Sequence, residues 1–158
     1  MAVLAQIIAE EPEVGWKLLI KLLPGLHEVA FPTAKPRYLE AGTSQRENLA
    51  YGLVADGRRG IVERAISLAG DQPERWVELI KGISVFEESQ RVRAAELLER
   101  FGAQMDSQKR TVIWTALRSF VAHNKAFPAA EWATKAADLE PFERLVTTFE
   151  TEHTCEST

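Results

Sequence analysis

DSQKRTVIWTALRSFVAHN, residues 106–124, places apolar side chains at steps of three and four along the chain. Such steps bring side chains onto one face of a helix that has about 3.6 residues per turn. Asp106 or Ser107 precedes the apolar residues, and either side chain can accept a hydrogen bond from the first amides of a helix. The stretch therefore predicts an amphipathic helix, whose buried stripe contains Ile113, Ala116, Leu117, Phe120 and Val121.

Similar patterns extend from this stretch in both directions. The preceding segment, 86–102, predicts a helix that Gly102 ends in the left-handed conformation. The dipeptide Asp56-Gly57 predicts a turn between two helices, and Pro141 predicts a break between two others. No alternating apolar run indicates a strand, so the sequence predicts an all-α protein of about eight short helices. The remaining predicted helices cover 14–23, 44–55, 59–70, 72–86, 129–140 and 141–150.

A loose repeat of the form Trp-x-x-Leu begins at Trp16, Trp76 and Trp114. The Trp and the Leu of each copy share a helix face, where the indole ring can wedge against a neighbouring helix. This repetition favours antiparallel helix pairs stacked in series, an α-α superhelix of the HEAT-like kind. A compact helical bundle is the alternative, because it produces similar patterns. We expect a single domain over 1–150 and a flexible tail over 151–158.

Composition argues against several classes of protein. The chain has 158 residues and a formal net charge of −4, whereas a general nucleic-acid binder carries an excess of Lys and Arg. The single cysteine, Cys155, leaves no internal disulfide and no cysteine cluster for zinc. No run of about eighteen apolar residues predicts a membrane span, and the first residues lack the pattern of a secretory signal. We expect a cytoplasmic protein with no membrane contact.

The first candidate site is the connection LHEVAFPTAKPRY, residues 26–38. His27-Glu28 begins like the zinc-peptidase motif His-Glu-x-x-His, but Phe31 occupies the position of the second histidine. Two prolines restrain the backbone of this connection. Contact with a partner is one interpretation of it, and a loop that covers one end of the core is the other. The residues that would make the partner contact are Lys35, Arg37 and Tyr38.

The second candidate site is Asp56-Gly-Arg-Arg-Gly60, where two glycines flank Arg58 and Arg59. Such a turn at the start of a helix can hold an anion, although a tight turn with solvated arginines explains the same residues. The spacings of a phosphate loop, a dinucleotide-binding loop and a nucleophile elbow are absent from the sequence. The three histidines are scattered, so the sequence predicts no enzyme, no cofactor and no metal site.

Residues 12–38, PEVGWKLLIKLLPGLHEVAFPTAKPRY, resemble a recurring segment of large, poorly characterised bacterial proteins with helical-repeat regions, sometimes labelled addiction-module-like. The segments GDQPERWVELI (70–80) and AFPAAEWA (126–133) resemble segments that follow in the same order. The resemblance runs from about Glu11 to Glu140. It implies an α-solenoid scaffold in a bacterial regulatory or defence assembly, and it transfers no catalytic residue.

These observations predict a non-enzymatic helical-repeat scaffold that binds a protein or peptide on an extended surface. Self-association is a further expectation, because unpaired solenoid faces are apolar. The alternative function is contact with nucleic acid through a local basic patch, which a steep loss of binding with added salt would reveal. That patch would contain Lys35, Arg37, Arg58 and Arg59.

Overall fold

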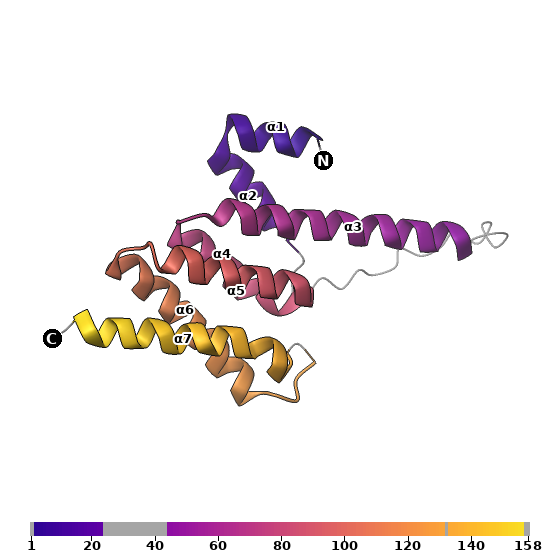
Figure 1. Cartoon of the computed structure of the whole chain (residues 1–158). Helices are drawn as coiled ribbons and strands as arrows, with labels where there is room; N and C mark the ends of the chain where they lie inside the picture. The colour runs from indigo at the N-terminus through magenta and orange to yellow at the C-terminus, as the bar shows by residue number, and fades with distance from the viewer. Residues whose placement is uncertain (1, 24–43, 132, 157–158) are drawn as a thin grey trace.

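The computed structural model describes residues 2–23, 44–131 and 133–156. Within these ranges all regular elements are helical, which confirms the all-α prediction. The helices pack against one another as one body (Figure 1). They are α1 (Ala2–Glu10), α2 (Pro12–Leu22), α3 (Ser44–Ala69), α4 (Pro73–Gly82), the 3-10 turn η1 (Ile83–Val85), α5 (Glu88–Gly102), α6 (Ser107–Ala126) and α7 (Ala136–Glu156).

Local signals in the sequence set several of the helix ends. The Asp106 carboxylate accepts a hydrogen bond of 2.8 Å from the amide of Lys109, which confirms the predicted cap of α6. Pro12 and Pro73 are the first residues of α2 and α4, where a missing N–H costs nothing. Gly70 ends α3 with a φ of +54°, a conformation that glycine adopts without strain.

The predicted turn at Asp56-Gly57 is wrong, because α3 runs without interruption from Ser44 to Ala69. A glycine within a helix costs only about 1 kcal/mol relative to alanine. The half of α3 that follows this dipeptide buries an apolar stripe, which outweighs that cost. The stripe consists of Val62, Ala65, Ile66 and Ala69.

The predicted break at Pro141 is also wrong, because Pro141 lies inside α7. Apolar side chains on both sides of the proline are buried, and their burial favours one continuous helix over the break. The residues concerned are Leu139, Phe142, Leu145 and Phe149, each at most 5% exposed. Because α7 continues to Glu156, the predicted tail over 151–158 begins inside this helix and not at its end.

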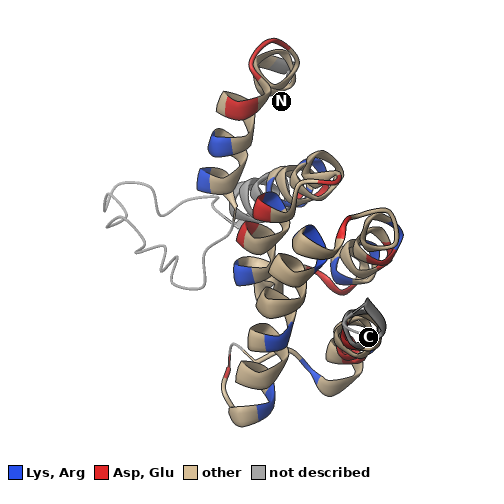
Figure 2. Ribbon diagram, turned by 90° about the vertical axis from the view of Figure 1, so that its left-hand side faces the viewer, with Lys and Arg blue, Asp and Glu red and all other residues tan. Residues whose placement is uncertain are grey.

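The helices form two layers. Helices α2, α4 and α6 lie on one side, and α3, α5 and α7 lie on the other, where Figure 2 views them nearly end-on. Packing joins α4 to α6 within the first layer, α5 to α7 within the second, and α2 to α3 and α6 to α7 between the layers. This order is compatible with the predicted superhelix of stacked pairs and with its alternative, a helical bundle. The largest fully buried side chains are those of Trp76, Phe142, Leu19, Ile66, Leu79 and Ile83.

The tryptophan of the first Trp-x-x-Leu copy, Trp16, joins α2 to α4. Trp16 and Trp76 are 4% and 0% exposed, which confirms the predicted burial of both rings. The Trp16 indole donates a 2.6 Å hydrogen bond to Glu78, and Arg75 lies over the Trp16 ring, 5.0 Å from its centroid. Arg75 also forms a 2.6 Å ion pair with Glu13. Both polar contacts join residues 62 positions apart, so α2 and α4 run in the same direction.

Two contacts likewise join α5 to α7 in parallel. Near the start of both helices, Arg91 forms a 2.5 Å ion pair with Asp138, and each side chain is 13% exposed. Near their ends, Gly102 lies against the Phe149 ring, so that a β-carbon at Gly102 would be 2.4 Å from Phe149 Cζ. The predicted left-handed conformation at Gly102 is wrong, because Gly102 is the last helical residue and only Gly70 has a positive φ among the described residues.

Gly102→Ala is expected to lower the free energy of unfolding by about 1–3 kcal/mol, because the added methyl group overpacks the contact with Phe149. Helix propensity alone predicts the opposite sign, since alanine favours a helix by about 1 kcal/mol over glycine. Gly57→Ala is the matched control, because a β-carbon at Gly57 meets no atom within 4 Å. Urea denaturation of both variants, followed by circular dichroism, checks the prediction, and equal stabilisation by both would contradict it.

Candidate functional site: a groove between α4 and α6

The structure places the predicted Arg58–Arg59 site inside α3 and not in a turn. Arg59 donates bidentate hydrogen bonds to the carboxylate of Glu87, with Nε 3.0 Å from Oε2 and Nη2 3.1 Å from Oε1. Asp56 lies 3.6 Å from the same guanidinium. The hydrogen bond and the charge of Glu87 raise the pKa of Arg59. Arg59 thus links α3 to the start of α5.

The other three predicted contact residues, Lys35, Arg37 and Tyr38, lie outside the described residues. Their proximity to Arg58 and Arg59 and their contact with a partner therefore stay predictions. Of the proposed basic patch, the structure describes Arg58 and Arg59, and the carboxylates of Asp56 and Glu87 engage Arg59.

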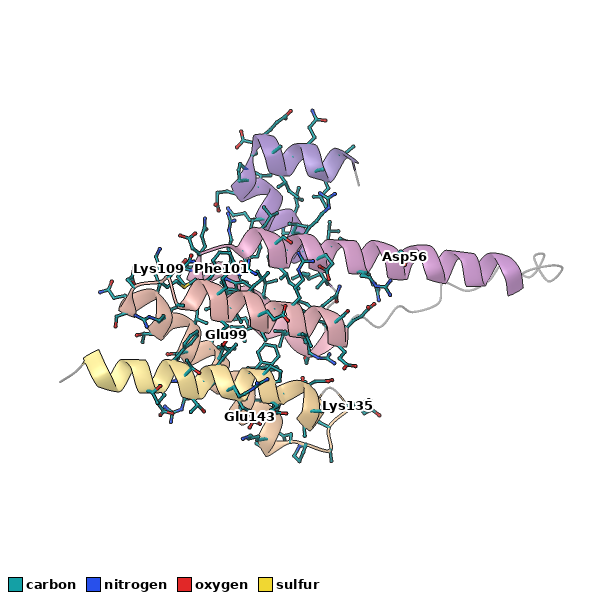
Figure 3. The ribbon with its side chains drawn as sticks, in the orientation of Figure 1. Asp56, Glu99, Phe101, Lys109, Lys135 and Glu143 are labelled. Atoms are coloured by element: carbon teal, nitrogen blue, oxygen red, sulfur yellow. The ribbon has the colours of Figure 1, made fainter. Side chains whose placement is uncertain are left out.

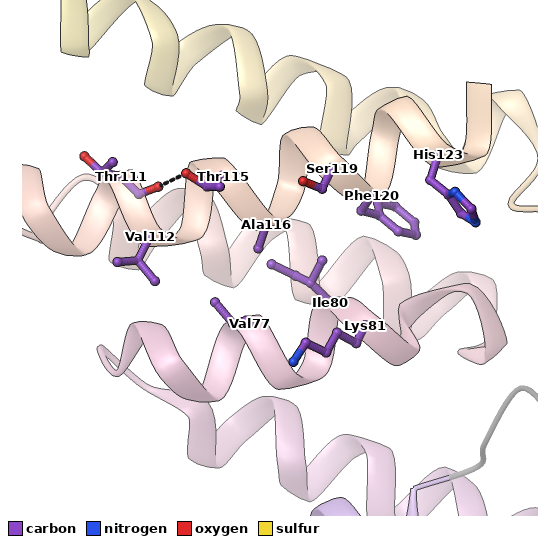
Figure 4. Close-up of a pocket in the computed structure, with 10 residues that line it drawn as sticks. All are labelled: Val77, Ile80, Lys81, Thr111, Val112, Thr115, Ala116, Ser119, Phe120 and His123. Carbon is purple, nitrogen blue, oxygen red and sulfur yellow. Dashed lines mark hydrogen bonds between the residues drawn. The ribbon is translucent and has the colours of Figure 1, made fainter. Parts of the chain in front are cut away.

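A different site lies between α4 and α6, on the layer formed by α2, α4 and α6. It is a groove with a volume of about 690 Å³. Figure 4 shows side chains from both helices pointing into the space between them. Val77, Ile80 and Lys81 line it from α4. The lining from α6 consists of Thr111, Val112, Thr115, Ala116, Ser119, Phe120 and His123.

Burial varies across the groove. Ile80 is 3% exposed and forms part of the floor, whereas Val112 is 44% exposed on the opposite wall. Phe120 is partly buried and meets Phe142 of α7 edge-on, at 5.7 Å between ring centroids. The groove is therefore supported from beneath by the contact between α6 and α7, and its apolar atoms face solvent.

The polar groups of the groove are few. The Thr111 and Thr115 hydroxyls each donate a 2.8 Å hydrogen bond to a carbonyl one turn earlier in α6, at Ser107 and Thr111. Lys81 is exposed and lies in the last turn of α4. His123 is exposed at the far end of α6, with its ring 5.4 Å from that of Phe127. No carboxylate is among the residues that line the groove.

Ser119 and His123 are one helical turn apart, which raises the question of a nucleophile and its base. Figure 4 shows their side chains pointing in different directions. A serine nucleophile also needs a third group that orients the histidine, and the lining contains no carboxylate for this task. In the described part of the chain, no three His, Cys, Asp or Glu residues gather as a metal site would require. The arrangement fits non-covalent binding of an apolar surface.

A second hollow of about 280 Å³ lies between α5 and α7. Its walls include Glu96, Glu99 and Arg144, and its floor includes Ala95 and Leu145. Charged side chains of both signs surround it, so it offers less continuous apolar surface than the α4–α6 groove. An ion pair of 3.0 Å joins the two layers, between Lys125 of α6 and Glu143 of α7. Figure 3 labels Glu143 on α7.

Sequence reasoning missed the α4–α6 groove. It assigned Ala116 and Phe120 to the buried stripe of α6, although both are only partly buried. A signal was present, because Thr111, Thr115 and Ser119 recur every fourth residue beside that stripe. These small side chains indicate a helix face with shallow relief, but they do not reveal which other helix lies beside it.

Comparison with known proteins assigns no relative to this chain, since it matches no family model, no curated protein and no solved structure. Among the helices that the structure describes, none combines the length and the apolar character that crossing a bilayer requires.

Proposed function

We propose that the chain is a non-enzymatic helical scaffold that binds a segment of a partner protein along the α4–α6 groove. The observation that carries this proposal is an apolar groove without carboxylates on the outer side of two packed helices. Pockets lined mainly by apolar side chains with a few polar groups are common binding sites for other molecules. The cytoplasmic location predicted from the sequence belongs to the same proposal.

The shape of the groove supports a polypeptide as the occupant. Its α6 wall extends from Thr111 to His123, which at 1.5 Å per residue is a length of about 18 Å. A groove of this length, open to solvent between two helices, accepts a chain segment lying along it. Ala116 and Ser119 keep the middle of this wall low, so that a segment can approach the α6 backbone.

Val112→Arg is expected to weaken binding at the groove, because a long charged side chain replaces an apolar contact at 44% exposure. The test is selection from a random peptide library against the wild-type protein and against this variant. Peptides enriched by the wild type should bind Val112→Arg at least about tenfold more weakly, as fluorescence anisotropy would measure.

Val92→Arg is the matched control. Val92 lies on α5 and is also 44% exposed, so the same substitution changes charge and volume equally at a place away from the groove. It should leave the affinity for the selected peptides unchanged. Selection that yields no peptide sensitive to Val112→Arg, or equal losses in the two variants, would overturn the proposed function.

A further inference from the structure

We infer that the occupant of the α4–α6 groove is an amphipathic α-helix with an acidic side chain placed against Lys81. This inference rests on the proposed function and specifies the chemistry of the partner. It follows from three properties of the groove, namely the hydrogen-bonding capacity of its walls, its dimensions and the sign of its charge.

The hydrogen-bonding capacity favours a helix over an extended segment. An extended peptide presents backbone N–H and C=O groups that need partners when they are buried. The groove has helical walls, whose own backbone groups are used within α4 and α6, and it has no strand edge to offer. The Thr111 and Thr115 hydroxyls already donate to α6 carbonyls. A helix satisfies its own backbone internally and needs only apolar contacts.

The dimensions accommodate about three turns of helix. Thr111 and His123 are twelve positions apart in α6, so an occupant that follows this wall spans a similar number of residues. Helices pack closest where side chains are small, and Ala116 and Ser119 provide such a place midway along the wall. Val77 and Val112 on either side would hold an apolar stripe of the occupant, as side chains at every third or fourth position provide.

The charge selects an acidic helix. Among the described residues that line the groove, Lys81 alone has a permanent charge, and it is exposed. The acidic residues of α4, Glu74 and Glu78, do not line the groove, and Glu78 accepts the hydrogen bond from Trp16. At the other end of the two helices, Lys109 lies 3.9 Å from Asp71, so that this pair adds no net charge. A carboxylate on the occupant therefore gains a cation near the ends of α4 and α6 without meeting an acidic side chain of the lining.

Labelled synthetic peptides of about 16 residues test this inference on the full chain. One has a leucine stripe at helical spacing with glutamates beside it, and a second has lysines in place of the glutamates. A third has the composition of the first with two prolines in its middle, which prevent a helix. The acidic helical peptide should bind tightest, the basic one about threefold more weakly, and the proline peptide at least about tenfold more weakly.

Lys81→Glu should reverse the preference, so that the basic peptide binds better than the acidic one by about threefold. Lys17→Glu is the matched control, because Lys17 is an exposed lysine of α2 outside the groove and its replacement changes net charge equally. It should leave the preference for the acidic peptide intact. Added salt should shrink the difference between the two helical peptides, since an exposed ion pair is screened.

Equal binding of the acidic and basic peptides, equal binding of the proline peptide, or reversal by Lys17→Glu would overturn the inference. If the library selects peptides sensitive to Val112→Arg that are basic or contain proline, this inference fails and the proposed function stands. If no selected peptide is sensitive to Val112→Arg, both fail. A dimer in sedimentation velocity that Val112→Arg abolishes would identify a second copy of the chain as the occupant and would also overturn the inference.

Discussion

Replacing Trp76 with alanine is expected to lower the free energy of unfolding by about 3–5 kcal/mol. Among the residues that the structure describes, Trp76 is the largest fully buried side chain, and it lies in α4. Its removal leaves a cavity that the surrounding helices fill only in part. The indole also donates a 2.8 Å hydrogen bond to the carbonyl of Gly70, which then loses its partner. Since the free energy of unfolding of a domain is about 5–15 kcal/mol, this single substitution removes a large share of the stability of the protein.

Chemical denaturation followed by circular dichroism measures this loss, and a decrease in melting temperature of roughly 6–20 °C should accompany it. Trp76→Phe retains most of the ring volume but not the indole N–H, so it should lose only about 1–2 kcal/mol. Val3→Ala is the control, because Val3 is 72% exposed and should matter by less than about 0.5 kcal/mol. A loss below about 1 kcal/mol for Trp76→Ala would contradict the packing of α4 described above.

Arg91→Ala is expected to cost roughly 2–4 kcal/mol of stability. The Arg91 guanidinium pairs with Asp138 at 2.5 Å and also donates to the carbonyl of Phe86, the residue that follows η1. Removal of Arg91 leaves the carboxylate of Asp138 without its partner, on a side chain that is only 13% exposed. An unpaired, mostly buried charge costs more than the net gain that the pair contributes.

A double-mutant cycle isolates this interaction. The variants are Arg91→Met, Asp138→Leu and the double variant, which replaces the pair with apolar side chains. Each single variant should be destabilised, and the double variant should recover much of the loss, because no stranded charge remains. Strictly additive losses in the cycle would show that the two side chains do not interact.

The sequence predicted helices well where one amphipathic segment determines its own fold. The stretch 86–102 yields α5 and 106–124 yields α6, with the Asp106 cap as expected. It failed at Gly57 and Pro141, where local preference for a turn or a break competes with burial of side chains on a neighbouring helix. The pattern of a single segment does not reveal how much is gained by burial against a neighbouring helix, because that gain depends on which helices pack together.

The candidate site was less accessible to sequence reasoning for the same reason. Val77 and Val112 are far apart in the chain and become neighbours only when α4 packs against α6. Reasoning from single motifs therefore selected Arg58 and Arg59, which stand out by composition, and Arg59 turned out to be engaged with Glu87. Val, Thr and Ala side chains are common in helices, so no sequence motif indicates a groove that they line.

The contacts of Arg91 with Asp138 and of Gly102 with Phe149 have a consequence for the axial alignment of α5 and α7. Both join residues that are 47 positions apart. If α7 slid along α5 by one turn, about 5.4 Å, the carboxylate would leave its guanidinium and the phenyl ring would lose the recess that glycine provides. The two contacts lie about three helical turns apart. Both oppose sliding of α7 along α5, the first through the attraction of opposite charges and the second through the fit of the ring against glycine. Together the two contacts set the register of α5 and α7, and each still favours that register when the other is weakened.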